Sequence, residues 1–318
     1  MKIQFVSIIR EFELLDPSLH DQQSLIFDSY THDPEHGTTK FLRSMDASQT
    51  PWIDSTVVMD DTINIGSGED PRAFYWNGSP CASAATYNPG HGFINKIYIK
   101  NLDKWFILIP PSNIKAGKNW SPFVYNDELH FVHQFSPFRV LKARFPSDRD
   151  GFIILDNVAE HNVYAPVSHD GFSVFRGGSN GIQIGDVIIG VGHTNKRKKR
   201  RSNSITHRPF LFVYSPGKNL TYYSFEYDFP ENTNIVDPTS LYEKDGTIYL
   251  VTSETEYTWD IVGQKCKTCL YTLDFTGGFH EDGIGSGGRR LHWWSHGKSP
   301  EIGRFLGAWC RSVVSRIR

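Results

Sequence analysis

Carboxylates, imidazoles and guanidinium groups stand beside short turn-and-strand segments that recur along this chain. In Glu69-Asp70-Pro71-Arg72, two carboxylates and a guanidinium precede an aromatic strand, and we favour a functional role for Asp70 over a structural one. Arg176 precedes Gly177-Gly178, a pair that lets backbone approach closely and leaves the guanidinium available for a phosphate or carboxylate. His193 ends an apolar strand, where a satisfied core histidine is an equal alternative to a ligand-binding one.

The elements that must position these groups repeat five times. Each segment has a Pro or Gly corner, an apolar strand, a polar turn and a second apolar strand. Asn-Gly and Asp-Gly turns in such segments are strong hairpin signals. Successive corners stand roughly 50–60 residues apart, as in the blades of a propeller. The corners are centred on Pro17, Pro71, Pro122, Gly178 and Pro238, with the first turn expected at Asp21-Gln22-Gln23.

The repeat predicts an all-β fold, a five-bladed β-propeller over residues 1–280, because antiparallel units arranged radially leave only short sheet edges. A two-sheet sandwich is the alternative, but it does not account for five similar corners. Residues 281–318 are expected to form a loop and a short C-terminal amphipathic helix on the propeller, since Ile302, Phe305, Leu306 and Trp309 have helical spacing.

In a propeller the inner strands converge, so polar residues at one end of them should meet at one site. The expected contributors combine carboxylates, imidazoles and arginines, which is more ionisable chemistry than a structural channel needs. Asp16 and Asp237 precede proline, where an aspartate often only holds the turn, and we favour that role for both. The other contributors are Asp28, Asp70, Tyr87, Ser121, His133, Arg176, His193, His207, Arg208 and Glu254.

Composition excludes several classes of protein. The net charge of −2 gives no basic field for nucleic acid, and Lys196–Arg201 is interpreted as a solvated loop tip rather than a nuclear signal or polyanion patch. No apolar run approaches the ~18 residues of a membrane span, and the start lacks a signal peptide, so we expect a cytoplasmic protein. The 4 Cys are sparse, and Cys266-x-x-Cys269 is interpreted as a hairpin with free thiols rather than a metal site.

The motifs together resemble glycoside hydrolase family 130, the mannoside phosphorylases and related mannosyltransferase-phosphorylases. The likeness spans most of residues 14–275, and Glu69-Asp70-Pro71-Arg72 resembles the motif that carries the family's catalytic aspartate. The other similar motifs are Asp16-Pro17-Ser18, Lys118-Asn119-Trp120-Ser121-Pro122-Phe123, Arg176-Gly177-Gly178, Gly192-His193 and His207-Arg208-Pro209-Phe210.

The resemblance implies an inverting mechanism on a β-mannoside-like oligosaccharide or sugar phosphate. Asp70 would be the general acid, and inorganic phosphate would attack the anomeric carbon as co-substrate, with no metal and no other cofactor. Trp120 would be a stacking platform for sugar. The implied phosphate ligands are Arg176, His193, His207 and Arg208, and the implied substrate-binding residues are Asp28, Glu69, Arg72, Asn119, Trp120, His133 and Glu254.

Two other functions remain open from the sequence. The first segment reads Phe27-Asp28-Ser29-Tyr30 where the family is expected to carry an arginine. If Glu254 acted as base for a water molecule, the same site would hydrolyse glycosides instead of phosphorolysing them. A propeller that binds glycans or proteins without turnover is the third hypothesis, and the sequence leaves the sugar, the linkage and the oligomeric state undetermined.

Overall fold

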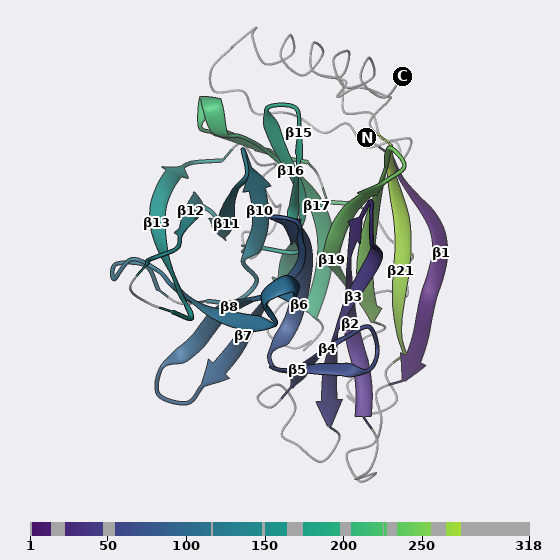
Figure 1. Cartoon of the computed structure of the whole chain (residues 1–318). Helices are drawn as coiled ribbons and strands as arrows, with labels where there is room; N and C mark the ends of the chain where they lie inside the picture. The colour runs from purple at the N-terminus through teal and green to yellow at the C-terminus, as the bar shows by residue number, and fades with distance from the viewer. Residues whose placement is uncertain are drawn as a thin grey trace, which may run out of the picture.

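Strands make up most of the chain that the structure describes (Figure 1). The computed structural model describes residues 2–13, 23–46, 55–115, 117–147, 150–163, 174–197, 205–224, 226–227, 234–255 and 265–274. The expected C-terminal loop and helix at 281–318 lie outside these residues, as do the Asp16-Pro17 corner and most of the basic run.

Antiparallel pairing divides the described strands into five successive units, and the fold is a β-propeller. Short parallel pairings of β13 with β9 and of β10 with β15 join the second, third and fourth units. The first unit contains β2 (Gln23–Asp33), β3 (Gly37–Asp46), β4 (Thr56–Met59) and β5 (Ile63–Ser67), and the second contains β6 (Glu69–Trp76), β7 (Ser79–Asn88), β8 (Gly92–Ile99) and β9 (Lys104–Ile109). The third contains β10 (Ser121–Tyr125), β11 (Glu128–Phe135), β12 (Phe138–Arg144) and β13 (Phe152–His161), and the fourth contains β14 (Val174–Arg176), β15 (Gly181–Ile184), β16 (Val187–Arg197), β17 (Ile205–Ser215) and β18 (Leu220–Tyr223). The fifth contains β19 (Ile235–Lys244), β20 (Thr247–Thr255) and β21 (Lys265–Asp274) together with β1 (Lys2–Glu13).

Four of the five predicted segments coincide with these units. Their hairpin turns lie where the sequence places them, and the turn residues have the positive φ that two-residue turns require, as at Asn77 (51°) and Gly78 (69°). The same holds at Asn126 (50°) and Asp127 (65°), whose carboxamide and carboxylate side chains tolerate this conformation. The turn residues therefore located the hairpins of these four units correctly. The number of propeller blades stays a prediction.

The first predicted segment was out of phase. β2 (Gln23–Asp33) is one continuous strand that includes the last residue of the turn expected at 21–23, and it pairs with β3 through a turn at residues 34–36. Ser29 on β2 is the reason for this phase, because its hydroxyl accepts a hydrogen bond from the Ala73 backbone at 2.6 Å and donates to the Thr239 carbonyl at 3.3 Å. The strand that joins the neighbouring units is thus the first strand of its unit, whereas the sequence analysis made it the second strand of its segment.

The N-terminal strand completes the last unit. β1 pairs antiparallel with β21 from Lys2 opposite Asp274 to Glu13 opposite Lys265, so the two ends of the described chain share one sheet (Figure 1). The sequence analysis did not anticipate this closure. Joining the ends removes the register freedom that an unpaired terminal strand would keep.

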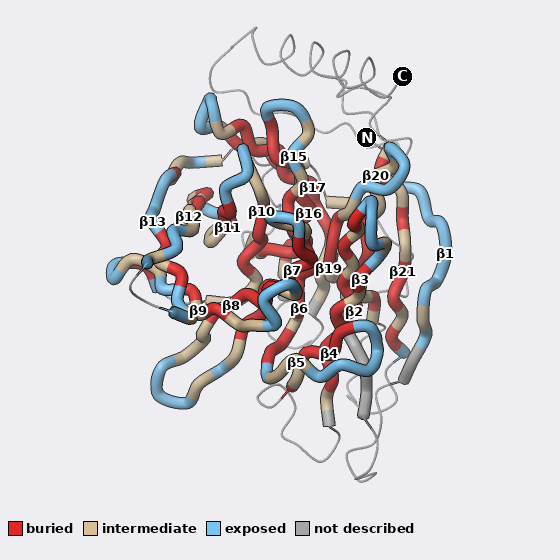
Figure 2. Tube along the Cα trace, viewed as in Figure 1, coloured by how far each residue is buried: buried red, intermediate tan, exposed pale blue. Residues whose placement is uncertain are grey.

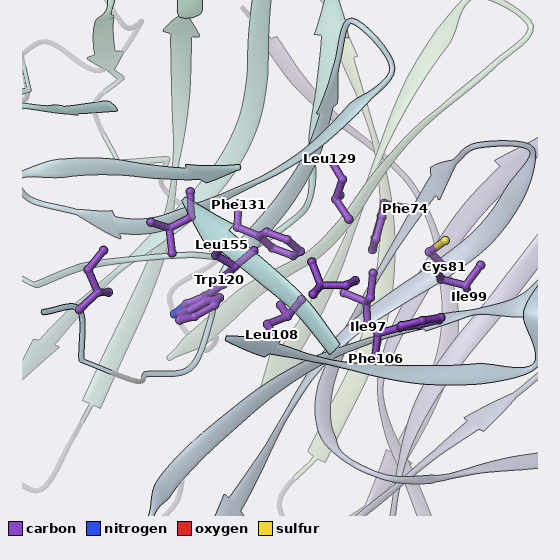
Figure 3. Close-up of a cluster of buried hydrophobic side chains, with 13 residues drawn as sticks. Phe74, Cys81, Ile97, Ile99, Phe106, Leu108, Trp120, Leu129, Phe131 and Leu155 are labelled. Atoms are coloured by element: carbon purple, nitrogen blue, oxygen red, sulfur yellow. The ribbon is translucent and has the colours of Figure 1, made fainter. Parts of the chain in front are cut away.

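The core lies between the units (Figure 2). One cluster fills the space between the second and third units, where Phe74 packs with Phe131 and Trp120 (Figure 3). A second cluster is built on Phe123, Phe210 and Phe212 and joins the third and fourth units. Continuous packing of this kind holds the inner strands, and hence their polar ends, in fixed positions.

Other sequence features have simple structural outcomes. Cys266 and Cys269 lie inside β21, both buried and without a disulfide, so the hairpin expected there is wrong. Residues three apart on a strand point to opposite faces, which prevents the pair from chelating one metal. No helix among the described residues is long and apolar enough to cross a membrane.

Candidate active site

Asp70 lies at a bulge of β6. The pairing of β6 with β7 shifts between Glu69 and Arg72, and Asp70 adopts a left-handed backbone with φ of 51°. Bulges of this kind redirect a side chain out of the regular pleat. The β2–β3 pairing shifts at the corresponding position, with Phe27 at φ 56°. Proline is tolerated at position 71, because the ladder of backbone hydrogen bonds between β6 and β7 is already interrupted there.

Cations surround the Asp70 carboxylate. Arg43 Nη1 donates to Asp70 Oδ1 at 2.7 Å, and Lys118 Nζ lies 3.9 Å from Oδ2. Burial raises the pKa of Asp70, but the charges of Arg43, Lys118 and Arg72 outweigh burial and hold the pKa below its usual range. The side chain is 17% exposed. The carboxylate is therefore ionised near neutral pH and can be reached from outside the core.

Glu69 is the second carboxylate of the group, and its pKa is shifted in the opposite direction to that of Asp70. Its side chain is only 4% exposed, and it faces Lys118 Nζ at 3.4 Å and Arg43 Nη2 at 3.5 Å. Burial first, and then the negative charge of Asp70, raise the pKa of Glu69. Two adjacent carboxylates with pKa values displaced in opposite directions are a common arrangement at acid–base sites.

Arg72 links three units of the fold. Its Nη2 donates to Asn119 Oδ1 at 2.9 Å, its Nη1 donates to the Asp70 carbonyl at 2.8 Å, and its Nε donates to the Gly178 carbonyl. Gly177 and Gly178 allow this approach, because a Cβ on Gly177 would stand 1.7 Å from the Asn119 carbonyl oxygen. The close backbone approach expected of the Gly-Gly pair is thus confirmed. Arg72 and Asn119 fix the position of the Asp70 loop.

A small cleft adjoins this group. Its polar lining includes Glu69, Asp70, Arg72, Lys118 and Asn119, and its apolar lining includes Ala84 and Trp120. Trp120 is only 2% exposed, and it packs edge-to-face on Phe131. The proposed stacking platform is therefore corrected: the Trp120 ring supports the floor of the cleft and offers no exposed face for a sugar.

A second polar cluster brings together His193, His207 and Asp237. His207 Nδ1 lies 2.7 Å from Asp237 Oδ1, and His193 Nε2 lies 3.7 Å from the same oxygen. Burial lowers the pKa of His193 to about 3, so the ring is neutral. Burial raises the pKa of Asp237, but the two histidines outweigh it and hold that pKa far below its usual range. Asp237 is thus an ionised partner of both rings and more than a turn-holding residue.

The two clusters are electrostatically connected. Asp237 acts on both Asp70 and Arg72, raising the pKa of each through its charge, although burial is the largest influence on both groups. Arg176 pairs with His193 across β14 and β16, and its charge lowers the pKa of His193 further. Arg208 Nη1 donates to the carbonyls of His207 at 2.9 Å and Asn234 at 3.0 Å.

Asp28 on β2 and Glu254 on β20 contact the closing strands β1 and β21 and do not line the cleft. Asp28 is 1% exposed, accepts from Thr268 Oγ1 at 2.9 Å and pairs with Arg10. Glu254 is also 1% exposed, and Tyr271 Oη donates to it at 2.5 Å. Their expected roles in sugar subsites, and that of Glu254 as a base for water, are corrected: both are buried acceptors that fasten β1 and β21 to β2 and β20.

His133 borders the cleft floor without opening onto it. Its Nε2 lies 3.1 Å from the Lys115 carbonyl, and its ring packs edge-to-face on Trp120. Arg43 and Lys118 belong to the clusters but were not assigned a role from the sequence, and Asp237 was interpreted as holding a turn. Arg43 could have been noticed, because it is a lone charge directly after the apolar pair Phe41-Leu42 and is 2% exposed.

The fold and its buried ionic clusters define a β-propeller with a polar site where the first strands of neighbouring units meet. No protein-family model matches the sequence, and no curated protein matches it. Solved structures do share the fold. A GDP-Man-dependent mannosyltransferase from Leishmania mexicana superposes with a TM-score of 0.53 and 15% identity, over 85% of this chain and 91% of that chain.

Two further solved structures have the same fold. A mannose phosphorylase from Leishmania mexicana, in complex with phosphate ion, has a TM-score of 0.51 and 11% identity over 85% of this chain and 89% of that chain. An alpha-L-arabinofuranosidase from Lactobacillus brevis has a TM-score of 0.50 and 10% identity over 89% and 100% of the two chains. Identities this low establish the propeller fold and nothing more specific.

Proposed function

We propose that this propeller is a carbohydrate-active enzyme that transfers a glycosyl group between phosphate and an acceptor hydroxyl, as in glycoside hydrolase family 130, with Asp70 as its proton-transfer residue. The observation that supports this most directly is the Asp70 carboxylate, held by Arg43 at 2.7 Å at the edge of a polar cleft and 17% exposed. The shared fold with a mannosyltransferase and a mannose phosphorylase favours glycosyl chemistry over a binding role.

Asp70 needs an anion nearby before it can act as an acid. In the free protein its pKa is lowered by Arg43, Lys118 and Arg72 against the opposing effect of burial. A phosphate dianion beside Lys118 would offset these cations and raise the pKa of Asp70 toward neutrality. Proton donation would then depend on bound phosphate, which links the co-substrate to the acid.

The proposed reaction is an inverting phosphorolysis. A phosphate oxygen bonds to the anomeric carbon as the glycosidic carbon–oxygen bond breaks, and the Asp70 proton goes to the departing oxygen. In the reverse direction, ionised Asp70 accepts the proton of the acceptor hydroxyl while phosphate leaves a sugar 1-phosphate. Glu69, Arg72 and Asn119 line the same cleft and would contact the hydroxyls of a β-mannoside-like sugar.

The phosphate is placed on the cations near Asp70. The sequence had assigned it to Arg176, His193, His207 and Arg208, but Asp237 lies 2.7 Å from His207 and would repel an anion between the two rings. Lys118, 32% exposed, carries the accessible positive charge in the cleft, and Arg43 adds its charge from the buried side of Asp70. Arg176 remains a phosphate candidate from the fourth unit.

The ionised state of Asp70 favours a second candidate function. A carboxylate with a lowered pKa is a ready general base, and inverting transfer from a nucleotide sugar needs a base to take the acceptor proton. In this case the nucleoside diphosphate would leave as the acceptor oxygen bonds to the anomeric carbon. The cleft residues would be the same and only the donor would differ.

The experiment is a donor panel assayed with the wild type and Asp70→Asn. Mannose 1-phosphate, other sugar 1-phosphates and GDP-mannose are each incubated with mannose and manno-oligosaccharide acceptors, and released phosphate and GDP are measured. Asp61→Asn is the matched control, because Asp61 is 53% exposed, pairs with Lys40 and lies outside the cleft. We expect release that persists in Asp61→Asn and disappears in Asp70→Asn.

The outcomes separate the hypotheses. Phosphate release from one sugar 1-phosphate supports the phosphorylase, and GDP release from GDP-mannose supports the nucleotide-sugar transferase. Turnover that survives Asp70→Asn contradicts the role of Asp70. Glycan binding without any turnover, unchanged in Asp70→Asn, would make the chain a binding propeller and would overturn the proposed enzyme.

A further inference from the structure

The His193, His207 and Asp237 cluster has the composition of a metal site. One ligand atom from each residue can be chosen so that all three lie within 4.8 Å of one another. The residues come from three strands, β16, β17 and β19, which belong to two neighbouring units of the propeller. Two imidazoles with one carboxylate are a ligand set that first-row divalent metals prefer.

The cluster suits a cation better than an anion. Asp237 Oδ1 is 2.7 Å from His207 Nδ1 and 3.7 Å from His193 Nε2, so a negative charge stands between the rings. His193 is buried, and the lone pair of an imidazole nitrogen is a common metal ligand. Among the described residues His193 Nδ1 and His207 Nε2 have no hydrogen-bond partner, whereas His207 Nδ1 and His193 Nε2 face Asp237.

We propose that His193, His207 and Asp237 bind one divalent transition-metal ion, with Zn²⁺ as the best match to two imidazoles and one carboxylate. Three protein ligands leave at least one position of a tetrahedral zinc open for a water molecule or an oxyanion. The Asp237 side chain is 24% exposed and the His207 side chain 15% exposed, so the metal can enter from their side. His193, 4% exposed, forms the closed side.

The surrounding backbone fixes the ligands in place. The His207 backbone N–H donates to the Asn234 carbonyl at 3.0 Å, next to the start of β19. Asp237 precedes Pro238, where β19 shifts register against β20, and Pro238 packs against Gly178. Preorganised ligands of this kind lower the cost of assembling a metal site.

The test measures metal directly and needs no sugar, so its result is separate from that of the proposed glycosyl transfer. The full-length chain is treated with a chelator, the chelator is removed, and Zn²⁺ is titrated by calorimetry while Co²⁺ is followed by its visible absorption. We expect about one ion per chain and a rise in melting temperature on adding Zn²⁺. Asp237→Asn and His207→Asn should weaken binding about 100-fold or more, since loss of an outer-shell partner alone costs about 10- to 100-fold.

His161→Gln is the matched control. His161 is also a partly buried histidine, with Nε2 2.9 Å from Thr221 Oγ1, but it lies on β13 outside the cluster. It should bind Zn²⁺ as the wild type does. The melting temperatures of all variants in chelator show whether they fold. Absence of saturable Zn²⁺ and Co²⁺ binding to the wild type, or binding that persists in folded Asp237→Asn and His207→Asn, would overturn the metal site.

Discussion

Arg43 Nη1 and Asp70 Oδ1 are 2.7 Å apart, and this contact joins the first two units of the propeller at the candidate active site. Arg43 is on β3 and Asp70 is on β6, so the two residues are far apart in the sequence. Because the Arg43 side chain is 3% exposed, water screens this pair weakly. The protonation of Asp70 is therefore controlled from the neighbouring unit.

Replacing Arg43 should raise the pKa of Asp70. An adjacent opposite charge lowers a carboxyl pKa by about 1–3 units, so Arg43→Met should shift the Asp70 titration upward by about that much. The shift is measured by ¹³C NMR of labelled aspartate carboxyls, with Asp70→Asn to assign the signal. Lys142→Met, which removes the partner of Glu128 on a different unit, should leave the Asp70 titration unchanged.

Arg43→Gln provides the same test with a polar side chain of lower packing cost. If both Arg43 variants fold and the Asp70 titration does not move, Lys118 and Arg72 hold its charge without Arg43. In that case Arg43 serves only to join β3 to β6.

Turn residues made much of the fold predictable, whereas no local sequence pattern predicted the pairing of β1 with β21. Positive-φ pairs such as Asn77-Gly78 mark hairpins locally, so four units could be located from the sequence. The first unit was misplaced because its alignment is set by Ser29, which bonds to Ala73 and to Thr239. Contacts between residues that are far apart in sequence cannot be inferred from a local pattern.

The candidate site was predictable in part for the same reason. Asp70 stands out because Glu69 and Arg72 flank it in sequence, and the structure keeps all three at one cleft. Its controlling partner Arg43 comes from another unit, and Asp237 was interpreted as a turn residue because proline follows it. Asp28 and Glu254 were wrongly placed in the site, because the sequence does not distinguish a strand carboxylate that faces a ligand from one that binds a neighbouring strand.

Asp33 should make stability depend on pH in the acid range. It accepts hydrogen bonds from the Glu35 backbone at 2.8 Å and from Tyr75 Oη at 3.1 Å, and His36 Nδ1 lies 2.7 Å away. These bonds, led by that from Glu35, lower its pKa to about 2. A lowered folded-state pKa stabilises the fold above the unfolded value, about 4, and this stabilisation is lost as pH falls toward 2.

Asp33→Asn should consequently lower the melting temperature at neutral pH, with the difference from wild type shrinking between about pH 4 and pH 2. Thermal melts across this range measure the difference. Asp61→Asn, a change at a half-exposed residue, is the control and should have a small effect throughout. A deficit in Asp33→Asn that is constant with pH would mean that hydrogen-bond geometry, and not the charge, carries its contribution.

Arg72 should be among the most important residues for stability. Arg72→Met would leave the acceptor oxygens of Asn119, Asp70 and Gly178 without their buried donor. Removing one partner from a buried charged network costs about 3–5 kcal/mol, which urea unfolding measures directly. Arg144→Met is the control, since Arg144 is 57% exposed and pairs with the exposed Asp156, and we expect a loss below about 1 kcal/mol. Equal losses of unfolding free energy in the two variants would contradict a role for Arg72 in linking the units.

Gly177 should not tolerate a methyl group. An alanine Cβ there would stand 1.7 Å from the Asn119 carbonyl oxygen and 3.1 Å from Ser121 Oγ, so the backbone of one unit must move away from the other. Overpacking of this kind typically costs about 1–3 kcal/mol, and displacement of Asn119 would also release Arg72 Nη2. Gly217→Ala is the matched control, because nothing lies within 4 Å of the position of its Cβ. Urea unfolding of the two variants should show a loss for Gly177→Ala and almost none for Gly217→Ala; similar stabilities would mean that the Arg176-Gly177-Gly178 corner can retreat without disturbing the Asp70 cleft.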